Sequence, residues 1–369
     1  MTQSPHSVIS DAKKPKDMKS ILYHRLILIT AALILASGIM EAQKVERNVT
    51  KNFTYNPGTS LNIDAKFGNV NILESDDNTV VVEANIWVES DNEKLAKELA
   101  ESLDAEISAS SNDINVTSVF PPKLPSRNNT KFGIDFTIHA PAGINLSLDN
   151  KYGAVYLEKI SGLAHIEVSY GTLKAQSLIH GRENDLNEVI LNYSTGTIDK
   201  AGWMKINLAY SKLSISEAKA VVALSMYSGL VLEECSSIVV ESKYDIYKIG
   251  EIKNYVGDLK YSNLSADEIS EKFEISSSYS NVKIGEIGVN FKNIKIDNMR
   301  GSYKIGINAG ASFTIKGEAI RGDIAVSGVD NLSEQIENAD KYISGRYGSN
   351  PKANVNITVK EGKVRISVE

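Results

Sequence analysis

Charged residues recur seventeen positions apart in the middle of this 369-residue chain. Glu241-x-Lys243 is followed by Asp258-x-Lys260, so these four side chains would lie together on one exposed face if the strands stack. Carboxylates beside basic groups on such a face could act as general acid and base on an acidic polysaccharide. The alternative is a solvated ladder of ion pairs, which contributes little to stability. The pattern favours this second interpretation.

The single cysteine, Cys235, could be a reactive thiol or nucleophile. One thiol cannot form an internal disulfide or a cysteine-based zinc site. Cys235 also occupies the same repeat position as Ala218 and Ile252. Because buried thiols are usually inert, we interpret Cys235 as a core residue.

Other motifs that carry chemistry are missing from the sequence. It contains no phosphate-binding GxxxxGK[ST] loop, no GxSxG nucleophile turn, no H-x-x-x-H pair and no GGxGxDxxx calcium repeat. His165 and His180 are interpreted as ordinary surface or coil residues. We therefore predict no catalytic residue, no metal ligand and no cofactor, and expect that the protein is not an enzyme.

The composition is that of a folded β-rich protein. Hydrophobic residues make up 42% of the chain and charged residues 23%, which is too apolar for disorder. Plentiful Ser, Asn, Tyr, Val and Ile favour strands and turns over helices. The net charge of −6 and the pI near 5.6 provide no general attraction to nucleic acid or to anionic lipid.

The elements that position these residues come from an internal repeat. A tyrosine followed by Ser, Gly or Asp recurs with successive spacings of 18, 23, 17, 17, 17, 17 and 18 residues. These residues are Tyr152, Tyr170, Tyr193, Tyr210, Tyr227, Tyr244, Tyr261 and Tyr279. Such a period predicts stacked units that bury a shared core.

Apolar residues occupy fixed offsets from each tyrosine. Offsets +3 and +5 lie on one face of a strand, a bend near +7 turns +8 inward, and a second strand carries +11, +13 and +15. The pattern predicts an all-β, single-chain β-solenoid with coils of about 17 residues. The parity of the tyrosines predicts that they point inward near a corner, and the Ser or Gly after each is expected to turn that corner. A tyrosine platform that stacks on sugars or bases is the alternative.

The repeat is interrupted near both ends. The coils are expected to start near residue 45, and a short helical insertion is predicted at about 91–107, capped by Asp91 or Asn92 and covering the open edge. Met299 is expected to take a tyrosine place, and the polar residues 331–344 to form a helical turn or two. Residues 353–369 are predicted to form a hairpin that caps the C-terminal end.

The first 42 residues have the layout of a pre-sequence and signal peptide. Lys19 and Arg25 precede a short apolar segment at 26–36, and small residues follow it. We predict cleavage after Ala42, which leaves residues 43–369 as the solenoid domain without a stable membrane span. An uncleaved anchor is an alternative, although a span needs about 20 apolar residues. A lipoprotein would need a cysteine that this region lacks.

An outward-facing apolar stripe is predicted on the second strand of the coils. Val222, Val239 and Val256 share offset +12, and Leu224 lies beside Val222. Exposed apolar patches can mark a partner surface. Because β-branched residues are also common on sheet surfaces, an ordinary strand face is the alternative.

Several of these features resemble the bacterial putative-adhesin domain family. They are the Phe/Tyr-Gly-x-Val-x-Ile unit near 66–73, the strand at 80–88, the helix at 95–103 and the Tyr-Ser/Gly coils. The resemblance covers about residues 45–369 and implies an exported β-solenoid in the periplasm, on the outer membrane surface or outside the cell. It implies a binding role, toward an unknown protein or glycan ligand, and carries no catalytic residues.

We therefore expect an exported, non-enzymatic adhesin-like interaction protein or envelope structural protein that does not bind nucleic acid. The alternative is a carbohydrate-binding or carbohydrate-active β-helix protein. Clustered carboxylates and exposed aromatic side chains along a groove would distinguish this alternative.

Overall fold

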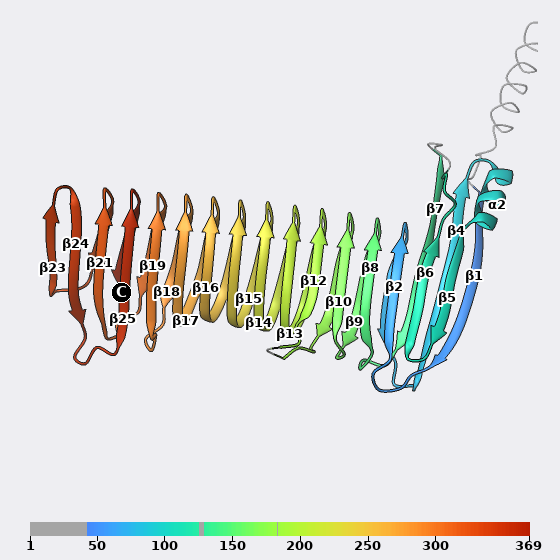
Figure 1. Ribbon diagram of the computed structural model, residues 1–369, viewed down its shortest axis with the longest axis horizontal. Helices are drawn as coiled ribbons and strands as arrows, with labels where there is room; N and C mark the ends of the chain where they lie inside the picture. The colour runs from blue at the N-terminus through green and yellow to red at the C-terminus, as the bar shows by residue number, and fades with distance from the viewer. Residues whose placement is uncertain (1–42, 125–128, 183) are drawn as a thin grey trace, which may run out of the picture.

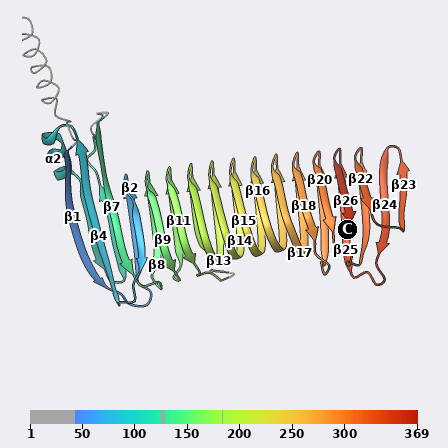
Figure 2. The same cartoon turned by 180° about the vertical axis from the view of Figure 1, so that it is seen from behind.

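The fold is all-β, as predicted. The structure is a computed structural model that describes residues 43–124, 129–182 and 184–369. Within these ranges 26 strands form one long mixed sheet, accompanied by one helix, α2 (Glu93–Ser102). Figures 1 and 2 show the strands side by side along one long axis, with α2 at one end. The predicted signal peptide lies outside the described residues.

The middle of the molecule is a regular stack of long, bent strands. Each strand pairs in parallel with the next at a shift of 17 residues, so Leu213, Leu230 and Tyr247 are neighbours. Between β16 and β17 the shift changes from 17 to 18 residues along the strand. Along the straight parts of these strands the backbone thereby pairs with the coils on either side. These strands are β13 (Thr195–Ala209), β14 (Lys212–Met226), β15 (Gly229–Lys243), β16 (Ile246–Lys260) and β17 (Asn263–Ser278).

The repeat continues toward the N-terminus with two shorter strands per coil. One strand leads to a corner residue and the other leaves it, and each kind pairs only with its own kind in neighbouring coils. The stack therefore has two rows of strands with the core between them. These strands are β2 (Ser60–Lys66), β3 (Val70–Glu74), β8 (Asn145–Lys151), β9 (Ala154–Ile160), β10 (Ala164–Ser169), β11 (Thr172–Leu178) and β12 (Asn187–Asn192).

The predicted inward offsets are confirmed. Residues at +3, +5 and +8 are buried in every regular coil, as are Met204, Val221, Ile238 and Tyr255 at +11. Large and small residues compensate one another: a Cβ on Gly257 would lie 2.6 Å from the hydroxyl oxygen of Tyr255. The core is therefore filled by complementary ladders of side chains.

The corner differs from the prediction. Each repeat tyrosine has a positive φ, for example 51° at Tyr210 and 52° at Tyr227, which is the left-handed region. This conformation reverses the side-chain alternation, so the tyrosines point outward and are 39–52% exposed. The following residue points inward instead, and Ser211, Ser228 and Asp245 are buried. The tyrosine itself makes the turn, and the predicted inward direction was wrong.

The N-terminal end is closed by strands that leave the stack and return to it. β4 pairs antiparallel with β1 and β7, and β5 pairs antiparallel with β6, while the β2–β3 coil lies one layer further in. The first coil strand is thus β2, which begins at Ser60, so the predicted start of the coils near residue 45 was wrong. β1 is an edge strand that pairs only with β4. The end strands are β1 (Gln43–Thr54), β4 (Thr79–Ser90), β5 (Asp104–Ser110), β6 (Asp113–Val119) and β7 (Thr130–Ala140).

Helix α2 and two basic side chains protect this end. Asn92 caps the helix by accepting a hydrogen bond from the Leu95 amide at 3.1 Å, and the helix packs against β1 and β4. It ends at Ser102, so the last predicted residues belong to β5 instead. On β1, Arg47 donates to the Leu103 carbonyl and Lys51 to the Ile107 carbonyl. Charged side chains on an edge strand discourage pairing with another chain.

The C-terminal residues 353–369 do not form the predicted hairpin. β25 (Ala353–Lys360) pairs in parallel with β19 (Asn293–Met299) and β21 (Phe313–Ile320). β26 (Lys363–Val368) pairs in parallel with β20 (Ser302–Ile307) and β22 (Asp323–Ser327), whereas β18 (Asn281–Ile287) precedes β20 in the stack. The last strands are thus one coil inserted between two earlier ones, and Figure 1 marks the C-terminus inside the stack.

A hairpin from another segment forms the C-terminal end. The polar residues 331–344, predicted as helical turns, lie in β23 (Leu332–Glu337) and β24 (Asp340–Tyr347), which pair antiparallel with each other. Asn338 and Ala339 both have positive φ, as the tight turn of a two-residue hairpin requires. The outer strand β23 is short and carries Glu334 and Glu337, so this edge also resists pairing.

Met299 does not take a tyrosine place. The next residue, Arg300, has φ of 57° and occupies the corner after Tyr279. Glu361 and Arg321 occupy the last two corners, with φ of 54° and 50°. The corner therefore lies one residue later than predicted.

Burial in the inserted coil leads to a stability prediction. Ile357 on β25 is 3% exposed between two neighbouring coils, whereas Ile336 on β23 is 68% exposed. Ile357→Ala should lower the free energy of unfolding by about 2–5 kcal/mol. Ile336→Ala, the matched control, should change it by less than about 0.5 kcal/mol. Chemical unfolding of both variants tests this, and equal effects would contradict the burial of Ile357 in the stack.

Candidate binding surface

The eight outward tyrosines form a continuous stack, here called the tyrosine ladder: Tyr152, Tyr170, Tyr193, Tyr210, Tyr227, Tyr244, Tyr261 and Tyr279. Neighbouring ring centroids are 4.8–5.2 Å apart and the ring planes differ by only 2–20°. The spacing follows from the distance between paired strands. Each stacked pair contributes about 0.5–1.5 kcal/mol beyond area burial, which offsets the cost of the left-handed backbone.

Both ends of the tyrosine ladder are covered. Phe67 stacks on Tyr152 with centroids 5.1 Å apart, and Phe120 and Phe132 meet the ring of Phe67 edge-on. At the other end the Arg300 guanidinium lies 5.4 Å from the centroid of Tyr279 and donates a hydrogen bond to its hydroxyl. The ring faces are therefore occupied along the whole ladder. Only ring edges and hydroxyls face solvent.

A charged ladder continues the aromatic one. Arg300 donates to Glu361 at 2.6 Å, and Arg321 pairs with the other oxygen of the same carboxylate. The hydrogen bond from Arg300 lowers the pKa of Glu361. Stacked corners of alternating charge replace stacked rings over the last coils.

A long groove runs beside the tyrosine ladder over five coils, with a volume of about 1150 Å³. Its wall on the ladder side is formed by Tyr170, Tyr193, Tyr210, Tyr227 and Tyr244. The accessible side chains that line the rest of it are Thr172, Thr195, Lys212, Ser214, Val231, Ile246 and Lys248. Ile246 is 56% exposed. The groove thus offers apolar contact, hydroxyl groups and positive charge to one extended ligand.

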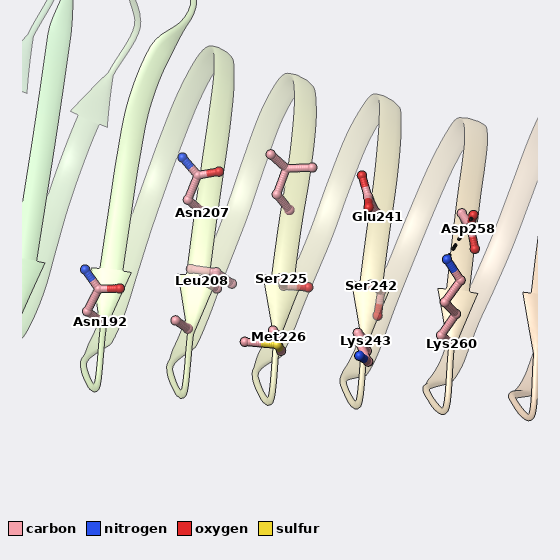
Figure 3. A pocket seen from close by; sticks show the side chains of 12 residues that line it. Asn192, Asn207, Leu208, Ser225, Met226, Glu241, Ser242, Lys243, Asp258 and Lys260 are labelled. Carbon is pink, nitrogen blue, oxygen red and sulfur yellow. Dashed lines mark ion pairs between the residues drawn. The ribbon is translucent and has the colours of Figure 1, made fainter.

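A second, smaller groove of about 440 Å³ lies on the outer face of the strands that lead to the ladder. It brings together the charged residues predicted from the sequence, with Glu241 beside Asp258 and Lys243 beside Lys260 on neighbouring coils. Figure 3 shows these side chains on one face, with Lys260 near Asp258 at 3.9 Å. Lys243 also lies 5.5 Å from the centroid of the Tyr244 ring.

The charged residues of the second groove do not resemble an acid–base pair. Glu241 and Asp258 are both exposed, whereas catalytic carboxylates are usually desolvated or paired so that their pKa values diverge. The single close pair, Lys260–Asp258, is an exposed contact of the kind that adds little stability. The arrangement suits the binding of a polar ligand.

The residues of the predicted apolar stripe are aligned on neighbouring strands, but charged residues lie among them. Val222, Val239 and Val256 are direct neighbours on β14, β15 and β16, and Val239 is 49% exposed. Leu224 is exposed as well, but its neighbours in the next two coils are Glu241 and Asp258. The structure places these residues on the outer face, and their role as a partner surface stays a prediction.

One carboxylate is buried beneath the tyrosine ladder. Asp245 occupies the inward position that serine holds in the neighbouring coils, and it is 1% exposed. The amides of Ser228 and Lys243 and the hydroxyls of Ser225 and Ser242 donate to it at 2.6–2.9 Å. Four donors compensate the lost hydration, so Asp245 has a structural role. Burial raises the pKa of the adjacent Tyr247.

Cys235 is a core residue, as predicted. It is 7% exposed, and Ala218 and Ile252 are its direct neighbours on the adjacent coils. Burial raises the pKa of its thiol to about 11. The thiolate that reacts with electrophiles is therefore scarce near neutral pH.

Other titratable groups form ion pairs rather than a cluster with metal-ligand geometry, within the described part of the chain. Within residues 43–124, 129–182 and 184–369, no group of three or more His, Cys, Asp or Glu side chains is arranged to hold a metal ion. His165 lies 3.1 Å from Glu188, which also accepts from Lys205, and this last hydrogen bond lowers the pKa of Glu188. In the described part of the chain, no helix is long and apolar enough to span a membrane.

The sequence predicted the tyrosine repeat but not its exposure. A signal was available, because Ser, Gly and Asp follow the tyrosines and small polar residues fit a tight inner corner better than tyrosine does. The groove beside the ladder was missed for the same reason, since it exists only when the rings point outward.

Comparisons with known proteins provide similar structures but no family. No family model and no curated protein matches the sequence. The similar solved structures include a putative cell adhesion protein from Clostridium sporogenes, with 13% identity and a TM-score of 0.20, covering 88% of this chain and 100% of that one. A putative adhesin from Parabacteroides distasonis has 10% identity and a TM-score of 0.31, covering 87% and 97%.

A further similar structure has a different name. A putative lipid binding protein, also from Parabacteroides distasonis, has 9% identity and a TM-score of 0.25, covering 87% of this chain and 96% of that one. At these identities and TM-scores the similarities carry no argument about what this chain binds.

The buried thiol leads to a reactivity prediction. With a pKa of about 11, roughly one Cys235 thiol in a thousand is ionised at pH 8. Native protein should therefore react with a thiol-specific disulfide reagent at least about a hundredfold more slowly than the same protein in guanidinium chloride. Absorbance of the released chromophore measures both rates, and equal rates would contradict the core position.

Proposed function

We propose that this chain is an exported β-solenoid that binds an extended ligand and acts as an adhesin-like interaction protein or an envelope structural protein. The long groove beside the tyrosine ladder is the observation that carries this proposal. Five successive coils with the same backbone conformation each contribute one tyrosine to it, so the aromatic wall repeats along the long axis while the other lining residues vary. A long ligand can then gain many weak contacts at once.

The second candidate is a carbohydrate-binding module, which the hydroxyl-rich groove also supports. Sugars commonly bind on the exposed face of an aromatic ring, but the faces of these rings cover one another. A glycan would have to use the tyrosine hydroxyls, the ring edges and the lysines of the groove. This candidate therefore predicts recognition by hydrogen bonds rather than by stacking.

The groove leads to a binding prediction. The protein would be tested against immobilised envelope glycans, mucosal glycans and extracellular matrix proteins. Ile246→Lys places a charge on the apolar part of the groove and should weaken capture at least about tenfold, equivalent to about 1.4 kcal/mol. Ile336→Lys alters a similarly exposed residue on β23, outside the groove, and should leave capture unchanged.

Other outcomes of this experiment decide between the surfaces. Loss of capture with Val239→Lys but not with Ile246→Lys would move the binding site to the apolar stripe. If no ligand of any class is captured by the unmodified protein, the adhesin-like role fails.

Export leads to a separate prediction about location. A C-terminally tagged protein would be followed while intact cells are treated with protease, beside a periplasmic control. Loss of the band from intact cells is the result expected for a surface adhesin. Survival until the outer membrane is opened would rule out adhesion and favour an envelope scaffold.

A further inference from the structure

The tyrosine ladder also brings together groups that react with one another. Eight phenols stand in one row, each with its ring within 5.2 Å of the next, and each ring is 39–52% exposed. We propose that this ladder is an oxidative cross-linking site, at which one-electron oxidants couple neighbouring tyrosines into dityrosine and join successive coils covalently. The oxidant is hydrogen peroxide, and a haem peroxidase uses it to oxidise the phenols.

Coupling of one pair of phenols consumes one hydrogen peroxide. Each of the two phenols loses one electron to the oxidant and one proton to water, which leaves two phenoxyl radicals. The radicals join through one new bond between ring carbons ortho to the oxygens. The hydrogen on each joined carbon then leaves as a proton while each oxygen regains one. In total two electrons and two protons reduce one hydrogen peroxide to two waters.

The geometry favours neighbours within one chain over other partners. Parallel pairing at a fixed register holds Tyr210 beside Tyr227, and Tyr227 beside Tyr244, wherever the coils are intact. Such fixed proximity gives a high effective concentration of one radical next to another. Exposure of the ring edges lets an oxidant reach the hydroxyls, whereas Tyr247, Tyr255 and Tyr303 are at most 1% exposed.

The surroundings of the ladder do not divert the radicals to sulfur. Thiols commonly reduce phenoxyl radicals, but the one cysteine of the sequence, Cys235, lies in the core at 7% exposure. That cysteine also cannot form an internal disulfide. Each dityrosine would instead close a loop of about one coil, which restricts the unfolded chain as a disulfide does.

The experiment oxidises the dilute purified full-length protein with hydrogen peroxide and a haem peroxidase. Dityrosine is followed by its blue fluorescence, and its position by mass spectrometry of proteolytic peptides. We expect cross-links between tyrosines one coil apart, with the protein still monomeric on a denaturing gel. The thermal unfolding midpoint should rise after oxidation.

Changing every second tyrosine of the ladder tests whether cross-linking needs neighbouring phenols or only exposed ones. Tyr170→Phe, Tyr210→Phe, Tyr244→Phe and Tyr279→Phe together keep every ring stacked but leave no two neighbouring phenols. Tyr152, Tyr193, Tyr227 and Tyr261 stay as exposed as before. We expect at least a tenfold loss of dityrosine within the chain, with circular dichroism unchanged.

The matched control changes residues outside the ladder. Tyr156→Phe with Tyr342→Phe removes two other tyrosines and should leave the yield unchanged. Undiminished cross-linking in the alternate-ring variant would overturn the proposal, as would cross-links formed mainly between chains. An unmodified ladder after oxidation that does modify free tyrosine would overturn it as well.

Discussion

The left-handed backbone at the corner of each coil is the constraint on which the rest of the structure depends. A non-glycine residue in this conformation costs about 1–2 kcal/mol, yet it recurs at Phe67, at all eight ladder tyrosines and at three charged residues. It reverses the side-chain alternation at one point, so a large ring faces solvent and a small polar residue faces the core. Stacked rings on the outside and hydrogen-bonded hydroxyls on the inside stabilise the same turn from both sides. Ser211, for instance, donates to the Leu191 and Ala209 carbonyls and accepts from the Ser194 amide.

The two ends solve the problem of unpaired strand edges in the same way. At each end, the coil that comes first or last in the sequence is not the outermost one. β2 lies between β6 and β8, and β25 lies between β19 and β21. At the N-terminal end both rows of strands finish in antiparallel strands, β4 with β1 and β5. At the C-terminal end one row finishes in the antiparallel β24 and β23, whereas the other ends at β22, which pairs in parallel with β26. Charged side chains then protect the outermost strands, Arg47 and Lys51 on β1 and the glutamates on β23. Both grooves lie between these ends, on the regular coils.

The buried face of each coil could be predicted from local periodicity. The pairing of strands far apart in the sequence could not. The fixed offsets of Leu213, Ile215 and Ala218 from Tyr210 identify the buried face because strand side chains alternate. The Asn92 cap and the apolar spacing of the helix are equally local signals. In contrast, the insertion of β25 between β19 and β21 depends on contacts between segments far apart in the sequence. The alternating pattern of β25 and β26 fits a hairpin as well as a coil, so sequence pattern alone favoured the simpler connection. The outward tyrosines were mispredicted because parity counting assumes an extended backbone at every residue.

The most direct test of this account compares glycine with alanine at one corner. Tyr210→Gly and Tyr210→Ala both remove the ring, so the lost stacking cancels in the comparison and the backbone term remains. Because φ at Tyr210 is 51°, the glycine variant should be more stable than the alanine variant by about 1 kcal/mol in chemical unfolding. The same pair at Ser214, in the extended strand β14, should show the opposite order by about 0.5–1 kcal/mol. If alanine is the more stable residue at position 210 as well, the left-handed corner and the outward ladder are wrong.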